Sequence, residues 1–385
     1  MSLSASLTKT QAMLALNGLP RLGPVTLRRL LNEFRDDPIA ILSASKSALL
    51  RVERIGDETA EIIRNWEKHF DLAREEKRLA RAGAAFVAIT DPDYPKPLKK
   101  IYDPPLGLYM IGPLRPSVKS VAIVGSRRTT LYGRGVAKRL AEDLNKLGFC
   151  VVSGLARGID TEAHQASVDV KGDTAAVLGC GVDIVYPPEN IELYKSIGER
   201  GVLISELPFG TRASKTTFPM RNRLIAGMSA ATIVVESDKS GGSMITARFA
   251  MEQNRPVFAV PGRIDQPSSA GCHQLIRDGA VLLTSVDDLI DELAYGGARQ
   301  TELELPDAAK PSASATAEKR ADALKDLNND ERSILEQLLD GDALTRDALA
   351  GKTGLPVASV SATLLMLELK RKVGKRADGA YEWRS

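Results

Sequence analysis

Three loops of the sequence combine small residues with the start of an amphipathic segment, and two of them also carry arginine. They follow the apolar runs VAIVG, CVVS and TIVVE. Small residues let the backbone approach a phosphate, and helix N-termini supply amide donors for anions. One such loop alone could be only a tight turn, but three at one predicted sheet edge favour an anion site. The candidate ligands are Ser126, Arg127, Arg128, Ser153, Gly154, Arg157, Ser240, Gly241 and Gly242.

A fourth segment, residues 205–228, holds four basic residues and one acid around a single aromatic, Phe218. The basic residues are Arg212, Lys215, Arg221 and Arg223. Basic groups bind phosphates, and an aromatic among them can stack on an unpaired base, so the segment favours single-stranded nucleic acid. Two alternatives stay open. Phe218 could pack into the core before Pro219 as a hydrophobic staple, and Asn222 and Arg223 could bond strand-end carbonyls instead.

Other ligand chemistries find little support in the sequence. There is no GxGxxG fingerprint and no GxxxxGK[ST] loop, so neither a dinucleotide motif nor a P-loop is present. The three cysteines, Cys150, Cys180 and Cys272, are widely spaced and form no CxxC pair. An odd number of scattered cysteines does not suit a disulfide framework or a zinc site. We therefore expect no metal and no cofactor.

The elements that position these loops follow from the hydrophobic pattern. Short continuous apolar runs alternate with longer amphipathic segments, which predicts a doubly wound parallel sheet whose strands are buried on both faces. Ligands bind at the carboxyl ends of the strands in such sheets, where the loops above are predicted. The seven runs are residues 121–125, 149–154, 174–179, 201–206, 231–236, 256–262 and 280–284.

Length and composition limit the organisation of the chain. Its 385 residues predict two to four domains, and 43% hydrophobic residues can build their cores. The net charge of +3 excludes a uniformly basic nucleic-acid-binding protein, so a polyanion site must be local. The predicted parts are a helical domain (1–80), a Pro-rich connecting segment (81–118), an α/β core (119–296), a flexible linker (297–325) and a small C-terminal domain (326–385).

No apolar run reaches about 18 residues, so no transmembrane helix is expected. The first twenty residues carry one lysine and no long apolar core, which does not match a signal peptide. The expected location is the cytoplasm, without membrane contact.

Taken together, the loops resemble the DprA/Smf family of bacterial DNA-processing proteins. The matching stretches run in order from about residue 95 to 293: VAIVGSRRTT, VVSGLARGIDTEAH, GCGVDIVYPPEN, FPMRNRLIAGMS, SGGSMITARFAMEQNRPVFAVPG and GCHQLIRDGA. The resemblance implies an extended Rossmann-like fold that binds single-stranded DNA. It also implies a non-catalytic homodimer that protects incoming DNA in natural transformation and helps to load the recombinase RecA.

The family's DNA pocket carries over onto particular residues of this chain. The resemblance implies that Arg127 and Lys215 hold phosphates, with help from Arg157 and Arg221, and that Phe218 stacks on a base. The family's RNR triplet corresponds to Arg221, Asn222 and Arg223.

The flanking domains carry resemblances of their own. Residues 11–70 contain two halves that resemble helix-hairpin-helix turns, but Arg21 and Arg54 replace the first glycine of each. A structural helical module, similar to a sterile alpha motif, is therefore expected. The C-terminal domain resembles a winged helix. Its third helix is rich in leucine, which favours protein contact or nonspecific DNA contact, and basic residues crowd positions 370–376.

Two other functions remain open on the same fold. One is an enzyme, because nucleotide phosphoribohydrolases of the "lonely guy" type share the superfamily and carry PGGxGTxxE. The comparable stretch here, SGGSMITARFA, lacks the Gly-Thr pair, and Glu252 lies further along. The other is a nucleotide-sensing module that regulates the winged helix.

Overall fold

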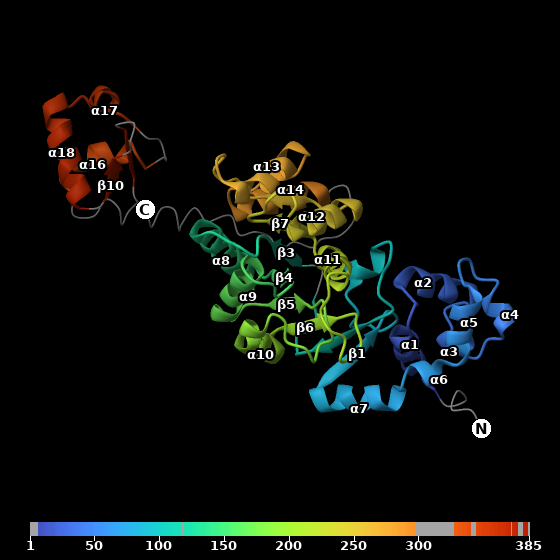
Figure 1. Cartoon of the computed structure of the whole chain (residues 1–385). Helices are drawn as coiled ribbons and strands as arrows, with labels where there is room; N and C mark the ends of the chain where they lie inside the picture. The colour runs from blue at the N-terminus through green and yellow to red at the C-terminus, as the bar shows by residue number, and fades with distance from the viewer. Residues whose placement is uncertain are drawn as a thin grey trace. The chain divides into compact units, whose positions relative to one another are not determined.

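The computed structural model of the chain describes residues 7–116, 119–297, 327–339, 344–370, 372–375 and 380–383 (Figure 1). It forms two compact units, residues 1–303 and 304–385. Residues 298–326 lie outside the described part, and with them the predicted flexible linker beyond Gly297. Two pieces near the C-terminus also lie outside the described part of the chain. They are Arg371, within the predicted basic cluster at 370–376, and residues 376–379, which begin at its last position.

A nine-stranded sheet forms the centre of the first unit. Its strand order is β1-β2-β6-β5-β4-β3-β7-β8-β9, and all neighbours from β6 to β9 are parallel. Every one of the seven predicted runs overlaps one of these seven strands. They are β3 (Ser120–Val124), β4 (Cys150–Ser153), β5 (Thr174–Val177), β6 (Val202–Ser205), β7 (Ala231–Val234), β8 (Val257–Ala259) and β9 (Val281–Leu282).

Helices cover both faces of this sheet (Figure 1). Val121 and Ile123 of β3 belong to one hydrophobic core, and Ala122 and Val124 of the same strand belong to another. Both faces of the sheet are therefore buried, which explains why the predicted runs are continuously apolar. The helices around the sheet are α8 (Leu131–Lys146), α9 (Ile159–Asp169), α10 (Ile191–Arg200), α11 (Thr217–Met228), α12 (Gly242–Glu252), α13 (Ala270–Arg277) and α14 (Val286–Gly297). The predicted doubly wound, Rossmann-like fold is confirmed.

The strand order reverses at β3. The chain proceeds from β3 through β4, β5 and β6 in one direction, and then returns to add β7, β8 and β9 on the other side. The two loops that leave the carboxyl ends of β3 and β7 therefore diverge, which leaves a crevice in which ligands bind in open α/β sheets.

The segment 81–118 does more than connect, which corrects our prediction. It adds β1 (Ala84–Ala88) and β2 (Gly107–Ile111) to the sheet, antiparallel to each other and to β6, so the sheet is mixed. Proline breaks a strand only where it falls within the ladder. Here the prolines lie between the two strands, around the 3-10 helix Lys96–Lys100, or after β2.

Between residue 7 and β1 the structure describes seven helices. They are α1 (Lys9–Gly18), α2 (Pro24–Glu33), α3 (Pro38–Leu42), α4 (Lys46–Leu49), α5 (Asp57–Arg64), α6 (Trp66–His69) and α7 (Leu72–Ala82). Arg21 and Arg54 hold the left-handed backbone, with φ of 63° and 65°, at the positions where a helix-hairpin-helix turn has glycine. Arg21 also pairs with Glu58 at 2.6 Å, which links the two turns. The expected helical module is present.

The second unit has a winged-helix architecture. Three helices pack around a core that includes Leu335, Leu349 and Leu364, and a short antiparallel hairpin follows. Gly354 ends the second helix in the left-handed conformation, with φ of 70°. The elements are α16 (Asn329–Glu336), α17 (Arg346–Thr353), α18 (Val357–Leu369), β10 (Val373–Lys375) and β11 (Tyr381–Trp383).

Across the ranges that the structure describes, no single helix is both long and apolar enough to cross a membrane. The bent pair formed by Arg346–Thr353 and Val357–Glu368 meets that test only when its two helices are taken together.

Candidate nucleic-acid-binding site

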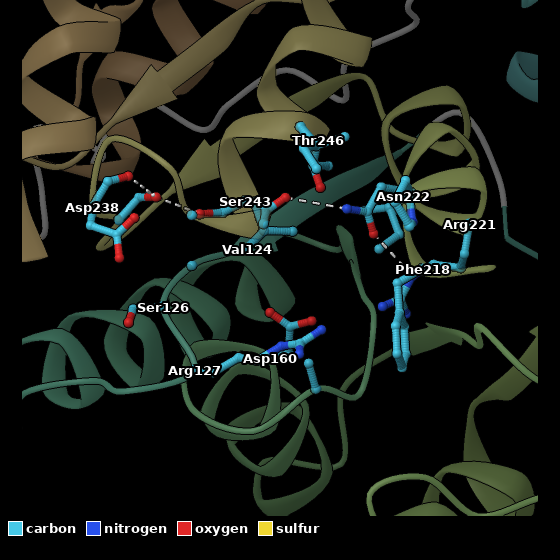
Figure 2. A pocket seen from close by; sticks show the side chains of 18 of the residues that line it. Val124, Ser126, Arg127, Asp160, Phe218, Arg221, Asn222, Asp238, Ser243 and Thr246 are labelled. Carbon is cyan, nitrogen blue, oxygen red and sulfur yellow. Dashed lines mark hydrogen bonds between the residues drawn. The ribbon is translucent and has the colours of Figure 1, made fainter. Parts of the chain in front are cut away.

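A cavity of about 390 Å³ opens at the carboxyl ends of β3 and β7, where the strand order reverses (Figure 2). The loop after β3, the first turns of α11 and the N-terminal turn of α12 form its walls. Eight of the predicted site residues line it: Ser126, Arg127, Arg128, Phe218, Arg221, Asn222, Gly241 and Gly242. The other six do not: Ser153, Gly154, Arg157, Lys215, Arg223 and Ser240.

A buried carboxylate holds the loop that carries the arginines. Glu236 follows β7, and its side chain accepts hydrogen bonds from the Thr130 amide (3.0 Å), the Thr130 hydroxyl (2.5 Å) and the Thr129 hydroxyl (2.9 Å). Thr130 also caps α8 by accepting from the Gly133 amide. The loop after β3 is therefore tied to the end of β7, which fixes Arg127 at the cavity rim. Sequence reasoning missed Glu236, although a charged residue ending a buried strand was a signal.

Phe218 is half-buried and lies beneath an arginine. The guanidinium carbon of Arg127 is 5.1 Å from the centre of the Phe218 ring, within the range of a cation–π contact. The ring of Tyr186 contacts the same phenylalanine, with 5.4 Å between the centroids. A Cβ at Gly179 would lie 2.8 Å from the Phe218 side chain, so a larger residue at this position would require the Phe218 ring to shift. The structure does not present the staple alternative for Phe218, because Phe218 is the second residue of α11 and its ring contacts Arg127 and Tyr186.

Arg221 lies in the floor of the cavity and is buried. Its guanidinium donates to the carbonyl oxygens of Gly154 (2.6 Å) and Val177, which end β4 and β5, and its Nε donates to Asn222. Burial lowers the pKa of Arg221 to about 10, although the negative charge of Asp160 acts to raise it. Most of its donors are therefore committed to the protein. The predicted contact between Arg221 and a phosphate remains a prediction. These hydrogen bonds make it less favourable, because they already use most of the guanidinium donors.

The other two residues of the RNR triplet, Asn222 and Arg223, form hydrogen bonds and ion pairs within the protein. Arg223 is buried away from the cavity, where it forms ion pairs with Asp103 (3.3 Å) and Glu206. Burial raises the pKa of Glu206, although the Arg223 charge opposes the shift. Asn222 donates to the carbonyl oxygen of Gly242 at 3.3 Å, joining α11 to α12. Asn222 and Arg223 thus make structural contacts, but not with strand-end carbonyls as the alternative expected, because Arg221 bonds to those of Gly154 and Val177.

The loop after β4 is already occupied by protein contacts. The Gly154 amide, predicted to assist a phosphate, donates to the Asp160 carboxylate at 3.1 Å. The Ser153 hydroxyl donates to the Ile123 carbonyl oxygen at 2.6 Å. Arg157 is exposed and forms an ion pair with Glu189, which raises the pKa of Arg157 chiefly through the hydrogen bonds between the two side chains. These groups support the site rather than line it.

The loop after β7 brings an acid to the rim. Gly241 and Gly242 line the cavity at the start of α12, as predicted. The Ser240 amide instead donates to Asp238 at 2.9 Å, and Asp238 itself lines the cavity. This side of the site is therefore less suited to a phosphate than the side that carries Arg127.

Lys215 lies on the exposed segment just before α11, three residues from Phe218. Within the described part of the chain, no three His, Cys, Asp or Glu side chains come together as a metal site.

Known families and proteins match much of this chain. The family model of DNA recombination-mediator protein A matches residues 85–294, and that of the DprA winged helix domain matches residues 318–379. Protein Smf of Synechocystis sp. is 34% identical over 96% of this chain and 98% of its own length.

Two solved structures are also similar. DNA processing protein A (DprA) of Streptococcus pneumoniae has a TM-score of 0.66 and 32% identity, covering 74% of this chain and 99% of its own. A structure of DNA processing protein A from Helicobacter pylori, described as giving insights into a unique single-stranded DNA binding mode, has a TM-score of 0.50 and 30% identity, covering 55% and 96%.

The role of Glu236 can be tested by Glu236→Gln. The amide would present a donor where the Thr130 amide and two hydroxyls need acceptors, so the free energy of unfolding should fall by about 1–3 kcal/mol. Urea denaturation followed by circular dichroism measures the change. Glu252→Gln, at an exposed acid on α12, is the matched control and should shift stability by less than about 0.5 kcal/mol. Equal stability of the two variants would contradict the anchoring role.

Proposed function

Because this chain belongs to the DNA recombination-mediator protein A family, the DprA/Smf DNA-processing proteins, we propose that it is a non-catalytic mediator that binds single-stranded DNA at the cavity between β3 and β7. The observation that carries the proposal is the pair formed by Arg127 and Phe218 at the cavity mouth. One member suits a phosphate and the other suits an unpaired base.

The charges at this mouth are available to a ligand. Among the described contacts, no acidic side chain forms an ion pair with Arg127, Arg128 or Lys215, whereas Arg157 is paired with Glu189. Exposed cations without an acidic partner can exchange their counterions for DNA phosphates at little cost. We therefore assign the phosphate contacts to these three residues, with the amides near Ser126, Gly241 and Gly242 assisting.

Phe218 supplies the preference for single strands. Its ring can stack only on a base that is not already stacked in a duplex, and such stacking tolerates different sequences. The description of the Helicobacter pylori relative as a single-stranded DNA binder supports the same preference.

The finer parts of the role rest on the family. We include in the proposal that the protein acts as a homodimer in the cytoplasm, protects incoming DNA during natural transformation, and helps to load RecA. The predicted domain boundaries belong to the same proposal, except that segment 81–118 forms part of the core sheet. The proposal also includes that the winged helix contacts protein or contacts DNA nonspecifically.

Two observations support the absence of catalysis. Glu252, the nearest counterpart of the phosphoribohydrolase glutamate, is exposed at the end of α12 and pairs with Arg248 at 3.5 Å. It does not line the cavity, and neither histidine nor cysteine is among the lining residues that the structure describes. Release of free base from nucleoside monophosphates by the purified protein would contradict this part.

Replacing the rim cations should change the salt dependence of binding. Arg127→Ala and Lys215→Ala should each weaken binding of a single-stranded oligonucleotide and reduce the slope of log K against log salt by about 0.7, because each removes one phosphate contact. Fluorescence anisotropy titrations at several salt concentrations measure both. Lys138→Ala, at an exposed lysine on α8, is the control. Unchanged slopes in both rim variants would exclude these residues as phosphate ligands.

Removing the aromatic should have a different signature. Phe218→Ala should weaken single-strand binding by about 1–3 kcal/mol without changing the salt slope, since stacking releases no counterions. Phe218→Tyr keeps the ring and should retain most of the affinity. The same titrations, repeated with a duplex of equal length, should show no effect of Phe218→Ala. A loss in slope equal to that of Arg127→Ala would refute the stacking role.

A further inference from the structure

Cations and an aromatic side chain also gather outside the cavity, on the 3-10 helix η2 (Lys96–Lys100) and the residues that follow it. Lys96, Lys99, Lys100 and Tyr102 are all exposed, and we call these four residues the η2 patch. Arg28 of α2 donates to the carbonyl oxygen of Tyr102 at 2.7 Å, across 74 residues of sequence. This bond holds the backbone beneath the patch in place.

Within the described part of the chain, no acidic side chain forms an ion pair with the three lysines of the patch. Residues 96–102 contain no acid, and the carboxylates on either side, Asp93 and Asp103, are already paired with arginines at 3.3 Å each. The Lys99 ammonium lies 5.6 Å from the centre of the Tyr94 ring, a contact that leaves its charge uncompensated. The phosphates of a nucleic acid can therefore displace the counterions of these lysines.

Tyr102 distinguishes the patch from an ordinary solvated group of lysines. It is 75% exposed, whereas Leu98 and Ile101 beside it are buried. The ring projects from a backbone that is already held in place, so stacking on it orders few further bonds. Basic groups around an exposed aromatic can hold an unpaired base. A duplex or an acidic protein surface would use the lysines alone, so the ring favours a single strand.

A strand held at the cavity can also reach the η2 patch. Leu98 and Ile101 pack on α11 at Gly227, where an added Cβ would lie 2.9 Å and 2.8 Å from their side chains. Phe218, at the cavity, precedes Gly227 on the same helix by about 14 Å along the helix axis. At about 3.4 Å per nucleotide, about four nucleotides cover that distance. The two surfaces are therefore close enough for one strand to contact both.

We propose that the η2 patch is a second contact surface for single-stranded DNA, outside the cavity. Its lysines contact phosphates of the strand that leaves the cavity, and Tyr102 stacks on one of the bases of that strand. This inference rests on the proposed single-strand binding and extends the bound length of the strand beyond the cavity.

The test measures binding of two single-stranded oligonucleotides, of about 20 and about four nucleotides, by fluorescence anisotropy at several salt concentrations. Only the longer one can contact the cavity and the η2 patch together. Lys99→Ala/Lys100→Ala should reduce the slope of log K against log salt by about 1.4 for the longer oligonucleotide, because each substitution removes a phosphate contact that contributes about 0.7. The slope for the shorter one should keep its wild-type value.

Lys138→Ala/Lys195→Ala is the matched control. It removes the same charge from two exposed lysines, on α8 and α10, which pair with Glu142 and Glu192 and do not line the cavity. Its slope should match that of the wild type. All four lysines are exposed, so both double variants should keep the wild-type melting temperature, which separates weaker binding from unfolding.

The aromatic contact has its own variants. Tyr102→Ala should weaken binding of the longer oligonucleotide about tenfold without changing the salt slope, the effect expected for one stacked base. Tyr102→Phe keeps the ring and should bind as the wild type does. A duplex of equal length should show no effect of Tyr102→Ala, because its bases are already stacked.

The outcomes separate this inference from the proposal beneath it. If Arg127→Ala weakens binding while Lys99→Ala/Lys100→Ala and Tyr102→Ala do not, the η2 patch is no DNA contact and the proposed function stands. The reverse result would support the patch and overturn the cavity assignment. An equal fall in slope for the shorter oligonucleotide would overturn a separate second surface, and an equal effect of Tyr102→Ala on the duplex would overturn the preference for a single strand. Failure of the wild-type protein to bind either oligonucleotide would overturn both proposals.

Discussion

The buried guanidinium of Arg221 is the contact on which the geometry of the site depends. It bonds to the carbonyl oxygens at the ends of β4 and β5, while Asp160 supplies opposite charge nearby. A cation is costly to bury unless such partners are in place, so these bonds favour the observed position of α11 against the sheet. Phe218 lies one helical turn before Arg221. The contact that seats the helix therefore also directs the aromatic ring toward Arg127.

A second buried charge places the opposite wall. Glu236 holds the arginine-bearing loop through two threonines, and no basic residue is needed for this because the bonds come from hydroxyls and an amide. The rim can then remain positive while the anchor below it is negative. The same separation explains how a chain with a net charge of only +3 can present a local anion site.

The sequence predicted the parts of this arrangement that depend on local pattern. Continuous apolar runs identified all seven parallel strands, and small residues beside arginine identified the rim. The antiparallel strands β1 and β2 were missed because prolines crowd the segment between them. Glu236 and Tyr186 were missed because each acts through a contact distant in sequence. For the same reason no local pattern could show that Arg223 faces Glu206 rather than DNA.

The N-terminal module shows how a binding turn can keep its shape after losing its chemistry. Arg21 and Arg54 retain the left-handed backbone at a cost of about 1 kcal/mol each, which glycine would avoid. Pro24 removes an amide from the start of α2, and Asp57 and Glu58 place negative charge at the start of α5. Both changes make the starts of these helices less favourable for a phosphate. The described contacts of this module are structural, and the DNA contacts that we propose lie in the core, at its cavity and at the η2 patch.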